Sequence, residues 1–522
     1  MLRKIRGVLA VLFFLGVTGL FLDFTGTCHA WLGWMAKVQF LPALLALNVG
    51  IVVLLVVLTL LVGRVYCSVI CPLGVMQDII SWISGRRKKH RYRFSYSPER
   101  KALRYGVLAL FLVALAAGVG SFVALLAPYS SYGRIASNLF APVWQWGNNL
   151  LARYSEQVGS YDFAATEVWI RSLPTFVIAV LTLVGVGVLA WRGGRTYCNT
   201  LCPVGTVLGF LSRFSLFRMT IDKAKCNRCG LCSRQCKAAC IDGREHRIDY
   251  SRCVACMDCI DTCRHGAIGF RLHRRQPAAA TENPAAATEK PAPVPEKPAP
   301  TTEKPASAAG QPVDASRRTF LTATVLTAAT AAVQAQKKKV DGGLAVIEDK
   351  KIPERTTPIV PPGAQGLCHM ARHCTACQLC VSVCPNGVLR PSTRLETLMQ
   401  PESSYERGYC RPECTRCSEV CPAGAIRKIS VADKSSIQIG HAVWVKENCV
   451  PLTDGVSCGN CARHCPVGAI QMVPSDPGVE GSVQIPVVNT ERCIGCGACE
   501  NLCPARPFSA IYVEGHERHS ML

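Results

Sequence analysis

Cysteine is the residue type in this sequence with the greatest capacity for chemistry, and 31 of the 522 residues are cysteine. Twenty-four of them form six sets of four, and the cleanest sets have the spacing C-x2-C-x2-C-x3-C. That spacing is the ligand run of bacterial ferredoxins, so the sequence predicts about six [4Fe-4S] clusters. Zinc sites need only C-x2-C pairs, and a disulfide framework does not require repeated C-x3-C tails. Both alternatives are therefore disfavoured.

Two of the sets lie between residues 220 and 272, where each run of three cysteines needs a fourth ligand. In two-cluster ferredoxins the fourth cysteine of each run ligates the other cluster. The first cluster is therefore expected on Cys226, Cys229, Cys232 and Cys263. The second is expected on Cys253, Cys256, Cys259 and Cys236, with Cys240 as an alternative to Cys236. Lys237 and Arg264 stand where a proline usually follows the fourth cysteine.

Four further sets lie between residues 340 and 522, and each ends in a cysteine that is followed by proline. Proline restricts the direction in which the chain leaves the ligand. The sixteen candidate ligands are Cys374, Cys377, Cys380, Cys384, Cys410, Cys414, Cys417, Cys421, Cys449, Cys458, Cys461, Cys465, Cys493, Cys496, Cys499 and Cys503. They predict four more clusters. The spacing leaves open whether the first set pairs with the second or with the fourth.

Two C-x3-C-P pairs remain, Cys67 and Cys71 in YCSVICPLG, and Cys198 and Cys202 in YCNTLCPVG. The two copies share the tyrosine, both cysteines, the proline and the glycine, which indicates an internal duplication. C-x3-C-P is also the second half of a ferredoxin ligand run. The four thiolates are candidates to hold an extra metal centre, either a cluster or copper. A pair of redox dithiols and a purely structural role remain open.

Long uncharged segments must position these motifs. They cover residues 7–22, 40–63, 105–133 and 172–191, and about 20 apolar residues span a bilayer as a helix. Basic residues stand before the first segment and after the second and fourth, which favours cytoplasmic placement of both ends of the set. This topology also accounts for the net charge of +23 without nucleic acid as a partner. The expected fold class is an α-helical membrane domain of four transmembrane helices joined to α+β bacterial-ferredoxin-like domains.

The sequence divides into five expected regions. Residues 1–215 form the membrane domain, 220–272 a two-cluster ferredoxin domain, 273–313 a disordered Pro/Ala-rich linker, and 340–522 a four-cluster ferredoxin-type domain. Between the last two, residues 314–339 contain Ser316-Arg317-Arg318-Thr319-Phe320-Leu321 and then an apolar stretch. This segment is similar to a twin-arginine export signal and is a candidate fifth transmembrane helix. We therefore expect a multi-pass protein of the bacterial inner membrane, with the first ferredoxin domain cytoplasmic and the C-terminal one periplasmic.

These motifs resemble two known families. The first 270 residues, with two C-x3-C-P motifs followed by two [4Fe-4S] motifs, resemble the NapH family. The last 200 residues, with a twin-arginine start and four [4Fe-4S] motifs, resemble the NapG/MauM family of exported ferredoxin-type proteins. The resemblance implies a fusion of two proteins that act together as a quinol dehydrogenase and feed electrons to periplasmic nitrate reductase.

The expected function is electron transfer from the membrane quinol pool through iron-sulfur clusters to a periplasmic reductase or cytochrome. Tyr66, Tyr197 and the loop around Trp144 and Trp146 are candidates for a quinone site, although such aromatics also serve as interfacial anchors. Because the hydrocarbon core is about 30 Å thick, an intermediate carrier must link clusters on its two sides. The alternative function is a maturation or metal-handling factor for a periplasmic redox enzyme, for which copper at the C-x3-C-P pairs would be diagnostic.

Overall fold

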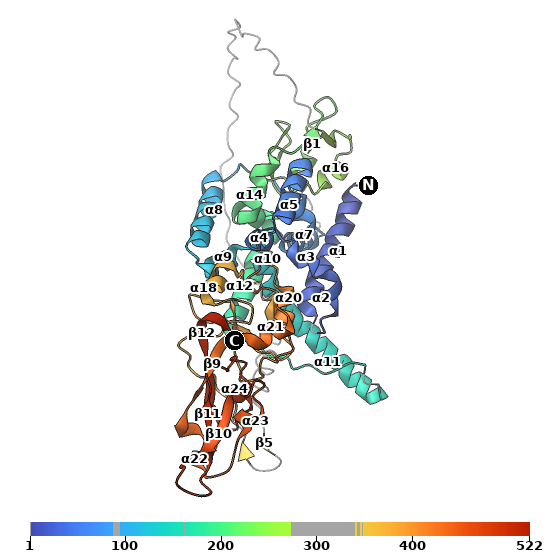
Figure 1. The fold of residues 1–522 in the computed structure, drawn as a ribbon. Coiled ribbons are helices and arrows are strands. Elements are labelled where there is room, and N and C mark those ends of the chain that lie inside the picture. The colour runs from blue at the N-terminus through green and yellow to red at the C-terminus, as the bar shows by residue number, and fades with distance from the viewer. Residues whose placement is uncertain are drawn as a thin grey trace, which may run out of the picture. The chain divides into compact units, whose positions relative to one another are not determined.

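A computed structural model describes residues 2–23, 25–86, 94–160, 162–272, 340–341, 345–346 and 348–522 (Figure 1). The chain divides into two compact units, one made of Met1–His273 with Lys350–Leu522 and the other of Arg274–Asp349. In the second unit the structure describes two short antiparallel strands, β5 (Val340–Asp341) and β6 (Ala345–Val346). The predicted linker and the twin-arginine segment lie outside the described residues.

Two helices are long and apolar enough to cross a membrane. They are α1 (Leu2–Leu22) and α12 (Leu173–Gly193), each of 21 residues with mean hydropathy above 2. Both expose rows of leucine and valine side chains, which suit contact with lipid. In the part of the chain that the structure describes, these are the two helices that meet both criteria. They indicate association with a membrane.

The other two predicted spans are broken, so the expected set of four continuous spanning helices is not confirmed. The segment 40–63 forms α4 (Phe40–Leu45) and α5 (Val49–Val62), with a left-handed Leu47 between them and Asn48 as the N-cap of α5. The segment 105–133 forms α8 (Lys101–Ala116), α9 (Gly120–Leu126) and α10 (Pro128–Ile135). Gly118 at φ 75° and Pro128 separate these three helices, because neither residue can continue a helix in the middle.

The internal duplication predicted from the C-x3-C-P motifs is visible in the order of helices. In the first copy, α5 leads to the short α6 (Val65–Val69) and then to α7 (Pro72–Gly85). In the second copy, α12 leads to the short α13 (Thr196–Thr200) and then to α14 (Pro203–Ser212). In both copies the proline after the second cysteine is the first residue of the third helix, a position that needs no N–H donor.

Shorter elements complete the helical part. They are α2 (Thr27–Leu32), α3 (Trp34–Lys37), the π-helical turn η2 (Ala136–Phe140) and the amphipathic α11 (Ala141–Val158). The first ferredoxin part then pairs β1 (Phe217–Ile221) with β4 (Ile268–Leu272), and β2 (Ile241–Asp242) with β3 (Arg247–Ile248), all antiparallel. Its two short helices are α15 (Leu231–Gln235) and α16 (Asp258–Thr262).

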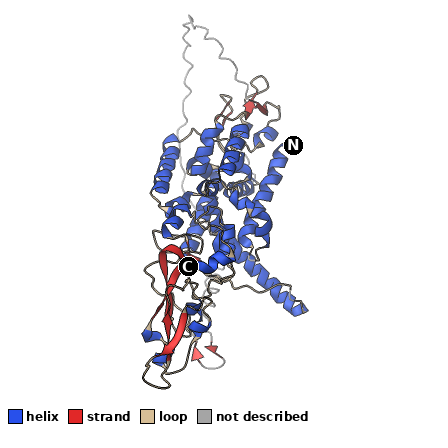
Figure 2. Ribbon diagram, viewed as in Figure 1, coloured by secondary structure: helices blue, strands red, loops and turns tan. Residues whose placement is uncertain are grey.

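The C-terminal part is built from short helices and antiparallel strand pairs (Figure 2). The strand pairs are β7 (Leu389–Pro391) with β8 (Pro401–Ser403), β9 (Ile437–Trp444) with β12 (Ile511–Met521), and β10 (Ile470–Pro474) with β11 (Gln484–Val488). The helices are α18 (Leu367–His373), α19 (Leu379–Ser382), α20 (Arg416–Val420), α21 (Val431–Ser436), η3 (Lys446–Asn448), α22 (Val450–Thr453), α23 (Asn460–Arg463) and α24 (Ala498–Leu502). The α+β ferredoxin-type domains expected from the cysteine motifs are present.

One hydrophobic core runs from the apolar helices into both ferredoxin parts. It contains Leu20 and Phe21 of α1, Val254 of the first ferredoxin part, and Val381 and Val420 of the C-terminal part. A second core, which includes Ile439, Ile470 and Val513, lies within the C-terminal part alone. The first half of the C-terminal domain therefore packs as part of the helical body, and the second half has a core of its own.

Candidate iron-sulfur and thiol sites

Three pockets are each lined by four cysteines, three from one set and one from another. The first gathers Cys226, Cys229, Cys232 and Cys263. The second gathers Cys410, Cys414, Cys417 and Cys384. The third gathers Cys449, Cys458, Cys461 and Cys503. This is the crossed arrangement of two-cluster ferredoxins, and it pairs the first C-terminal set with the second and the third with the fourth.

The remaining runs follow the same crossed arrangement. Cys421 lies close enough to interact electrostatically with Cys374, Cys377 and Cys380. Cys465 interacts in the same way with Cys493 and Cys496. Burial raises the pKa of Cys377 and of Cys496 to about 12. Such thiols stay protonated at neutral pH unless a metal supplies positive charge, so their environment fits ligation.

The ligand loops share a backbone conformation that explains how they wrap a cluster. In the four sets with C-x2-C-x2-C spacing, the second residue after the first cysteine and the fourth are both left-handed. These residues are Arg228 and Gly230, Ala255 and Met257, Ala376 and Gln378, and Gly495 and Gly497. Five of the eight are not glycine, so the loops hold a conformation that is costly for ordinary residues. The third cysteine of each run then lies in the first turn of a short helix.

No three His, Cys, Asp or Glu side chains among the described residues converge as the ligands of one metal ion would. Thiolates around a cubane stand further apart, because they surround four irons and four sulfides. The donor sets therefore fit clusters better than they fit mononuclear zinc.

Lys237 explains why one expected proline is missing. Its side chain is buried, and its ammonium lies 2.9 Å from carboxylate oxygens of both Asp78 and Asp258. Its carbonyl oxygen accepts a hydrogen bond from the Arg195 amide at 2.8 Å. The residue after Cys236 thus ties the first ferredoxin part to α7 and α13, a role that proline cannot fill. Arg264, at the equivalent position after Cys263, is exposed.

Cys236 and Cys240 lie together, with their sulfur atoms 3.6 Å apart. Hydrogen bonding with Cys240 lowers the pKa of Cys236 and that of Cys253. Hydrogen bonding to both neighbours in turn raises the pKa of Cys240. This arrangement suits Cys236 and Cys253 as thiolate ligands and Cys240 as a thiol whose single S–H donates to one of them at a time.

Replacement of Cys240 by alanine is therefore expected to leave the iron content unchanged. It should lower the midpoint potential of the adjacent cluster by roughly 50 mV, because a lost hydrogen bond of about 1 kcal/mol destabilises the more negative reduced state. C236A should instead lose about four irons. Iron analysis and a redox titration followed by paramagnetic resonance measure both effects. C240S keeps a donor and serves as the control, and loss of iron in C240A would make Cys240 the ligand.

The four C-x3-C-P cysteines, Cys67, Cys71, Cys198 and Cys202, are brought together and are hereafter called the thiol quartet. Each is no more than 4% exposed. Cys202 interacts electrostatically with Cys67, Cys71 and Cys198, and Cys71 interacts with Cys67 and Cys198, so the four thiols are neighbours. Cys71 and Cys202 are the N-caps of α7 and α14, where the helix dipole favours a thiolate.

Two arginines cross between the duplicated copies. Arg64 donates to the carbonyl oxygen of Cys198 at 3.2 Å, and Arg195 donates to that of Cys67 at 2.6 Å. A Cβ atom at Gly74 would lie 2.7 Å from the Arg195 guanidinium, and one at Gly205 would lie 2.8 Å from that of Arg64. The glycine shared by the two motifs therefore leaves space for the crossing arginine.

The surroundings of the buried Arg64 guanidinium indicate whether the thiol quartet carries negative charge. It is 0% exposed, lies 3.7 Å from the Cys67 sulfur and donates to Asn199. In the described part of the chain none of its hydrogen bonds or ion pairs reaches a carboxylate. A fully buried cation is costly unless an anion is close, and the thiol quartet supplies that anion when its cysteines ligate a metal centre.

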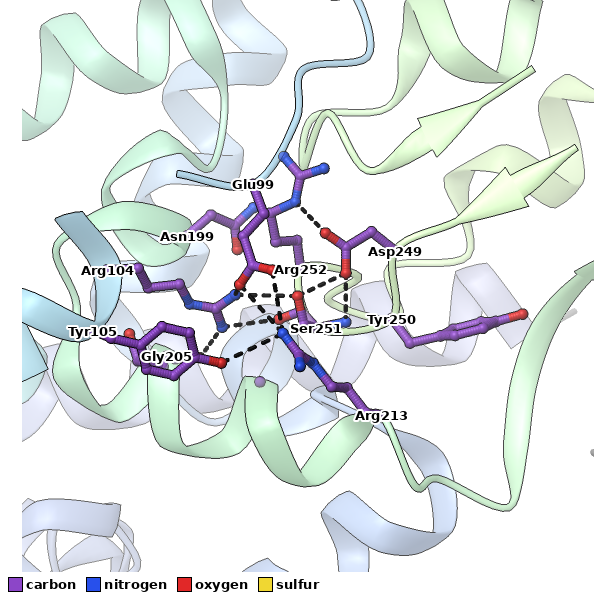
Figure 3. Close-up of polar contacts among 12 residues, drawn as sticks. Glu99, Arg104, Tyr105, Asn199, Gly205, Arg213, Asp249, Tyr250, Ser251 and Arg252 are labelled. Carbon is purple, nitrogen blue, oxygen red and sulfur yellow. Dashed lines mark hydrogen bonds and ion pairs between the residues drawn. The ribbon is translucent and has the colours of Figure 1, made fainter. Parts of the chain in front are cut away.

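The same arginine joins the thiol quartet to the first ferredoxin part, at the network of polar contacts around Ser251 and Arg104 that Figure 3 shows. Ser251, two residues before Cys253, accepts hydrogen bonds on its carbonyl oxygen from Arg64 at 3.1 Å and from Arg104 at 3.0 Å. Arg104 also donates to Gly205 of α14 and pairs with Glu99 at 2.8 Å. This polar network holds the Cys253 loop in a fixed position relative to the helix that follows Cys202.

The thiol quartet also adjoins the first C-terminal set. Tyr66 lies near Cys67, Cys71 and Cys202, and Tyr129 lies near Tyr66, Cys377 and Cys421. Arg134 on α10 is 0% exposed and interacts electrostatically with Cys377 and Tyr197. Gly133 lies so close to the Cys377 carbonyl oxygen that a Cβ atom at this position would clash with it. Sequence reasoning missed these residues, because their proximity depends on how distant helices pack.

The structure places the aromatic residues named for a quinone site in two different environments. Tyr66 is buried and donates to Gln39 at 3.1 Å, and Tyr197 is buried and donates to the carbonyl oxygen of Leu126 at 3.0 Å. Trp144 and Trp146 are exposed on α11 and line none of the pockets described here. The two tyrosines are thus packed within the helical body, and the two tryptophans are placed as interfacial anchors would be.

Comparisons with known proteins identify the class. A family model described as "4Fe-4S binding domain" matches residues 44–90 and 173–222, which include the thiol quartet. A second, described as "4Fe-4S dicluster domain", matches residues 456–506. No solved structure matches the chain. The chain is thus an iron-sulfur electron-transfer protein with ferredoxin-type domains.

The most similar curated proteins give the family. The ferredoxin-type protein MauM of methylamine utilization from Methylobacillus flagellatus is 30% identical over 31% of this chain and 70% of its own length. The ferredoxin-type proteins NapG and NapF of Escherichia coli are 31% and 27% identical, over 64% and 87% of their lengths and 27% and 30% of this chain. The chain belongs to the family of ferredoxin-type proteins that includes MauM. The resemblance of its N-terminal part to NapH stays a prediction.

Proposed function

We propose that this protein oxidises a membrane quinol and distributes the electrons through iron-sulfur centres to an acceptor on the periplasmic side. The observation that carries the proposal is the unbroken series of cysteine sites within one structural unit. The first ferredoxin part, the thiol quartet and the first C-terminal set are each joined to the next by buried arginines and tyrosines. The two apolar helices α1 and α12 support placement in a lipid bilayer, where quinol is dissolved.

A centre at the thiol quartet would shorten the distance that an electron must cross between clusters on the two sides of the membrane. Arg64 contacts both the Cys67 sulfur and the residue two before Cys253, and Tyr129 lies between Tyr66 and the ligand set of Cys377 and Cys421, near both. A centre on the quartet would divide a crossing of about 30 Å into shorter steps. Six [4Fe-4S] clusters and this seventh centre, each of which takes up one electron at a time, form the proposed electron path.

The proposal places the protein in the bacterial inner membrane. The first ferredoxin part faces the cytoplasm and the C-terminal part the periplasm, where a nitrate reductase or a cytochrome is the proposed acceptor. MauM serves methylamine utilization by its name, and NapF and NapG are named as ferredoxin-type proteins. The acceptor of this chain is therefore to be identified by experiment.

Anaerobic reduction by quinol tests the function. The full chain is purified without oxygen, placed in phospholipid vesicles, and mixed with the menaquinol analogue menadiol. We expect paramagnetic resonance signals of reduced [4Fe-4S] clusters to appear, with an iron content near 24 or above. Dithionite serves as the positive control for clusters that can be reduced. Clusters that respond to dithionite and stay oxidised with menadiol would refute quinol oxidation.

A metal-handling role is the second candidate, and the buried thiol quartet favours it, since soft thiolate ligands suit Cu(I). Anaerobic titration with Cu(I) distinguishes the two functions. One copper bound per chain, lost in C71S, would support metal handling. Iron at the quartet together with reduction by menadiol would support the electron path.

A further inference from the structure

One pocket of the structure is not lined by cysteine and lies where the apolar helices meet the C-terminal part. Its walls come from the end of α1, from η2 and α11, from residues 168–171, and from the start of α12. Ser382, at the end of α19, closes it on the side of the first C-terminal set. The pocket encloses about 150 Å³.

The lining combines flat apolar walls with a few polar groups. Phe21, Trp169 and Phe176 supply aromatic surface. Ser137, Gln145 and Arg171 supply hydroxyl, amide and guanidinium groups. The hydroxyl of Ser137 is buried and has no hydrogen-bond partner within the described residues. A flat ring that carries oxygen substituents would fill the apolar walls and satisfy this hydroxyl.

The wall at Trp169 is held rigidly. The guanidinium groups of Arg390 and Arg407 lie 4.4 and 4.6 Å from the centre of its ring, and Arg407 also pairs with Glu167 at 2.7 Å. Cation–π contacts of this kind fix the orientation of the indole. The aromatic wall is therefore preformed and does not depend on a ligand.

The pocket borders the segment that separates two expected clusters. Arg171 donates to the carbonyl oxygen of Val381, and its guanidinium interacts with Cys380 and Cys384. Cys380 belongs to the run that approaches Cys421, and Cys384 lines the pocket of Cys410, Cys414 and Cys417. A molecule in this pocket would thus lie beside two one-electron acceptors.

Access to the pocket is apolar. Ile170, which lines the pocket, is 59% exposed, and Val143, next in sequence to the lining residue Pro142, is 69% exposed. The two helices that are apolar enough to cross a membrane, α1 and α12, contribute Phe21 and Phe176 to the lining. A lipid-soluble molecule with a long hydrocarbon tail can therefore reach the pocket from the bilayer.

We propose that this pocket binds the ring of a quinol and is the point at which its electrons enter the protein. The inference rests on the proposed function and assigns it a site. The quinol loses two electrons and two protons to become a quinone. Clusters held by the ligand sets of Cys380 and of Cys384 would each take up one electron, and the two protons would leave to water.

Filling the pocket tests the proposal. Gln145→Phe places a ring from the α11 side, where the side chain is only half-buried, and Ser137→Leu fills it from η2. Both variants are expected to slow reduction by menadiol at least tenfold and to leave iron content and reduction by dithionite unchanged. Trp146→Leu alters an exposed side chain of the same helix outside the pocket and should behave as wild type.

A second measurement detects binding of the quinone ring without electron transfer. Menadione is expected to quench the fluorescence of Trp169 in the oxidised wild type, and the quenching should be lost in Gln145→Phe and weakened in Trp169→Phe. Filled variants with full iron content and an unchanged rate of menadiol oxidation would overturn the pocket and leave quinol oxidation standing. Quenching in a wild type that menadiol cannot reduce would refute the function and retain the pocket as a ring-binding site.

Discussion

Replacement of Cys198 by serine is expected to separate the first ferredoxin part from the quinol-reduced C-terminal part. The Cys198 thiol is buried in the thiol quartet and accepts a hydrogen bond from Gln77 at 3.2 Å. Loss of this ligand removes the centre that the quartet would hold. The electron must then cross most of the roughly 30 Å hydrocarbon core in one step, a distance too long for transfer at the wild-type rate, so its passage should stop on the time scale of the wild-type reaction.

The measurement compares two groups of clusters in one protein. After rapid mixing of C198S with menadiol, the signals of the C-terminal clusters should appear at the wild-type rate, and those of the two clusters between residues 220 and 272 should stay absent over the same period. Cys28, which lies outside the quartet, supplies the matched control C28S, with wild-type kinetics expected. Equal reduction of both groups in C198S would show that the quartet carries no electrons.

Replacement of Asp78 by asparagine is expected to destabilise the attachment of the first ferredoxin part by about 3–5 kcal/mol, as for a broken buried ion pair. Asp78 lies on α7 with its side chain 14% exposed. Its carboxylate accepts from Arg195 at 2.7 Å, from Lys237 at 2.9 Å and from Arg6 at 3.4 Å. Without that charge, three cations from α1, the start of α13 and the first ferredoxin part face one another with only Asp258 nearby.

Hydrogen exchange of residues 220–272 measures this effect, together with the rate at which a chelator removes iron from the two clusters there. Both rates should rise by about two to four orders of magnitude in D78N. The control is D261N, because the ion pair of Asp261 with Arg3 is nearly half exposed on both sides and is worth at most about 1 kcal/mol. Similar exchange in D78N and the wild type would show that the polar network does not hold this part in place.

The cysteine chemistry could be predicted from spacing alone, because a cubane needs thiolates at short and regular intervals along the chain. This is why the ferredoxin-type character, the α+β elements between residues 217 and 272, and the duplication around Cys67 and Cys198 could be read from local patterns. The helix count could not be predicted in the same way. Hydropathy averages over Leu47 and Gly118, whereas the backbone breaks at both residues.

The tertiary structure alone decided how the sites relate to one another. Cys384 lines a pocket with Cys410, and Cys503 lines one with Cys449, which settles a choice that spacing left open. The buried arginines at positions 64, 134 and 195 read in the sequence as ordinary basic residues. Arg195 pairs with Asp78, and Arg64 donates to Asn199 and Ser251, all on elements far away along the chain, so their role depends on packing that no local pattern records.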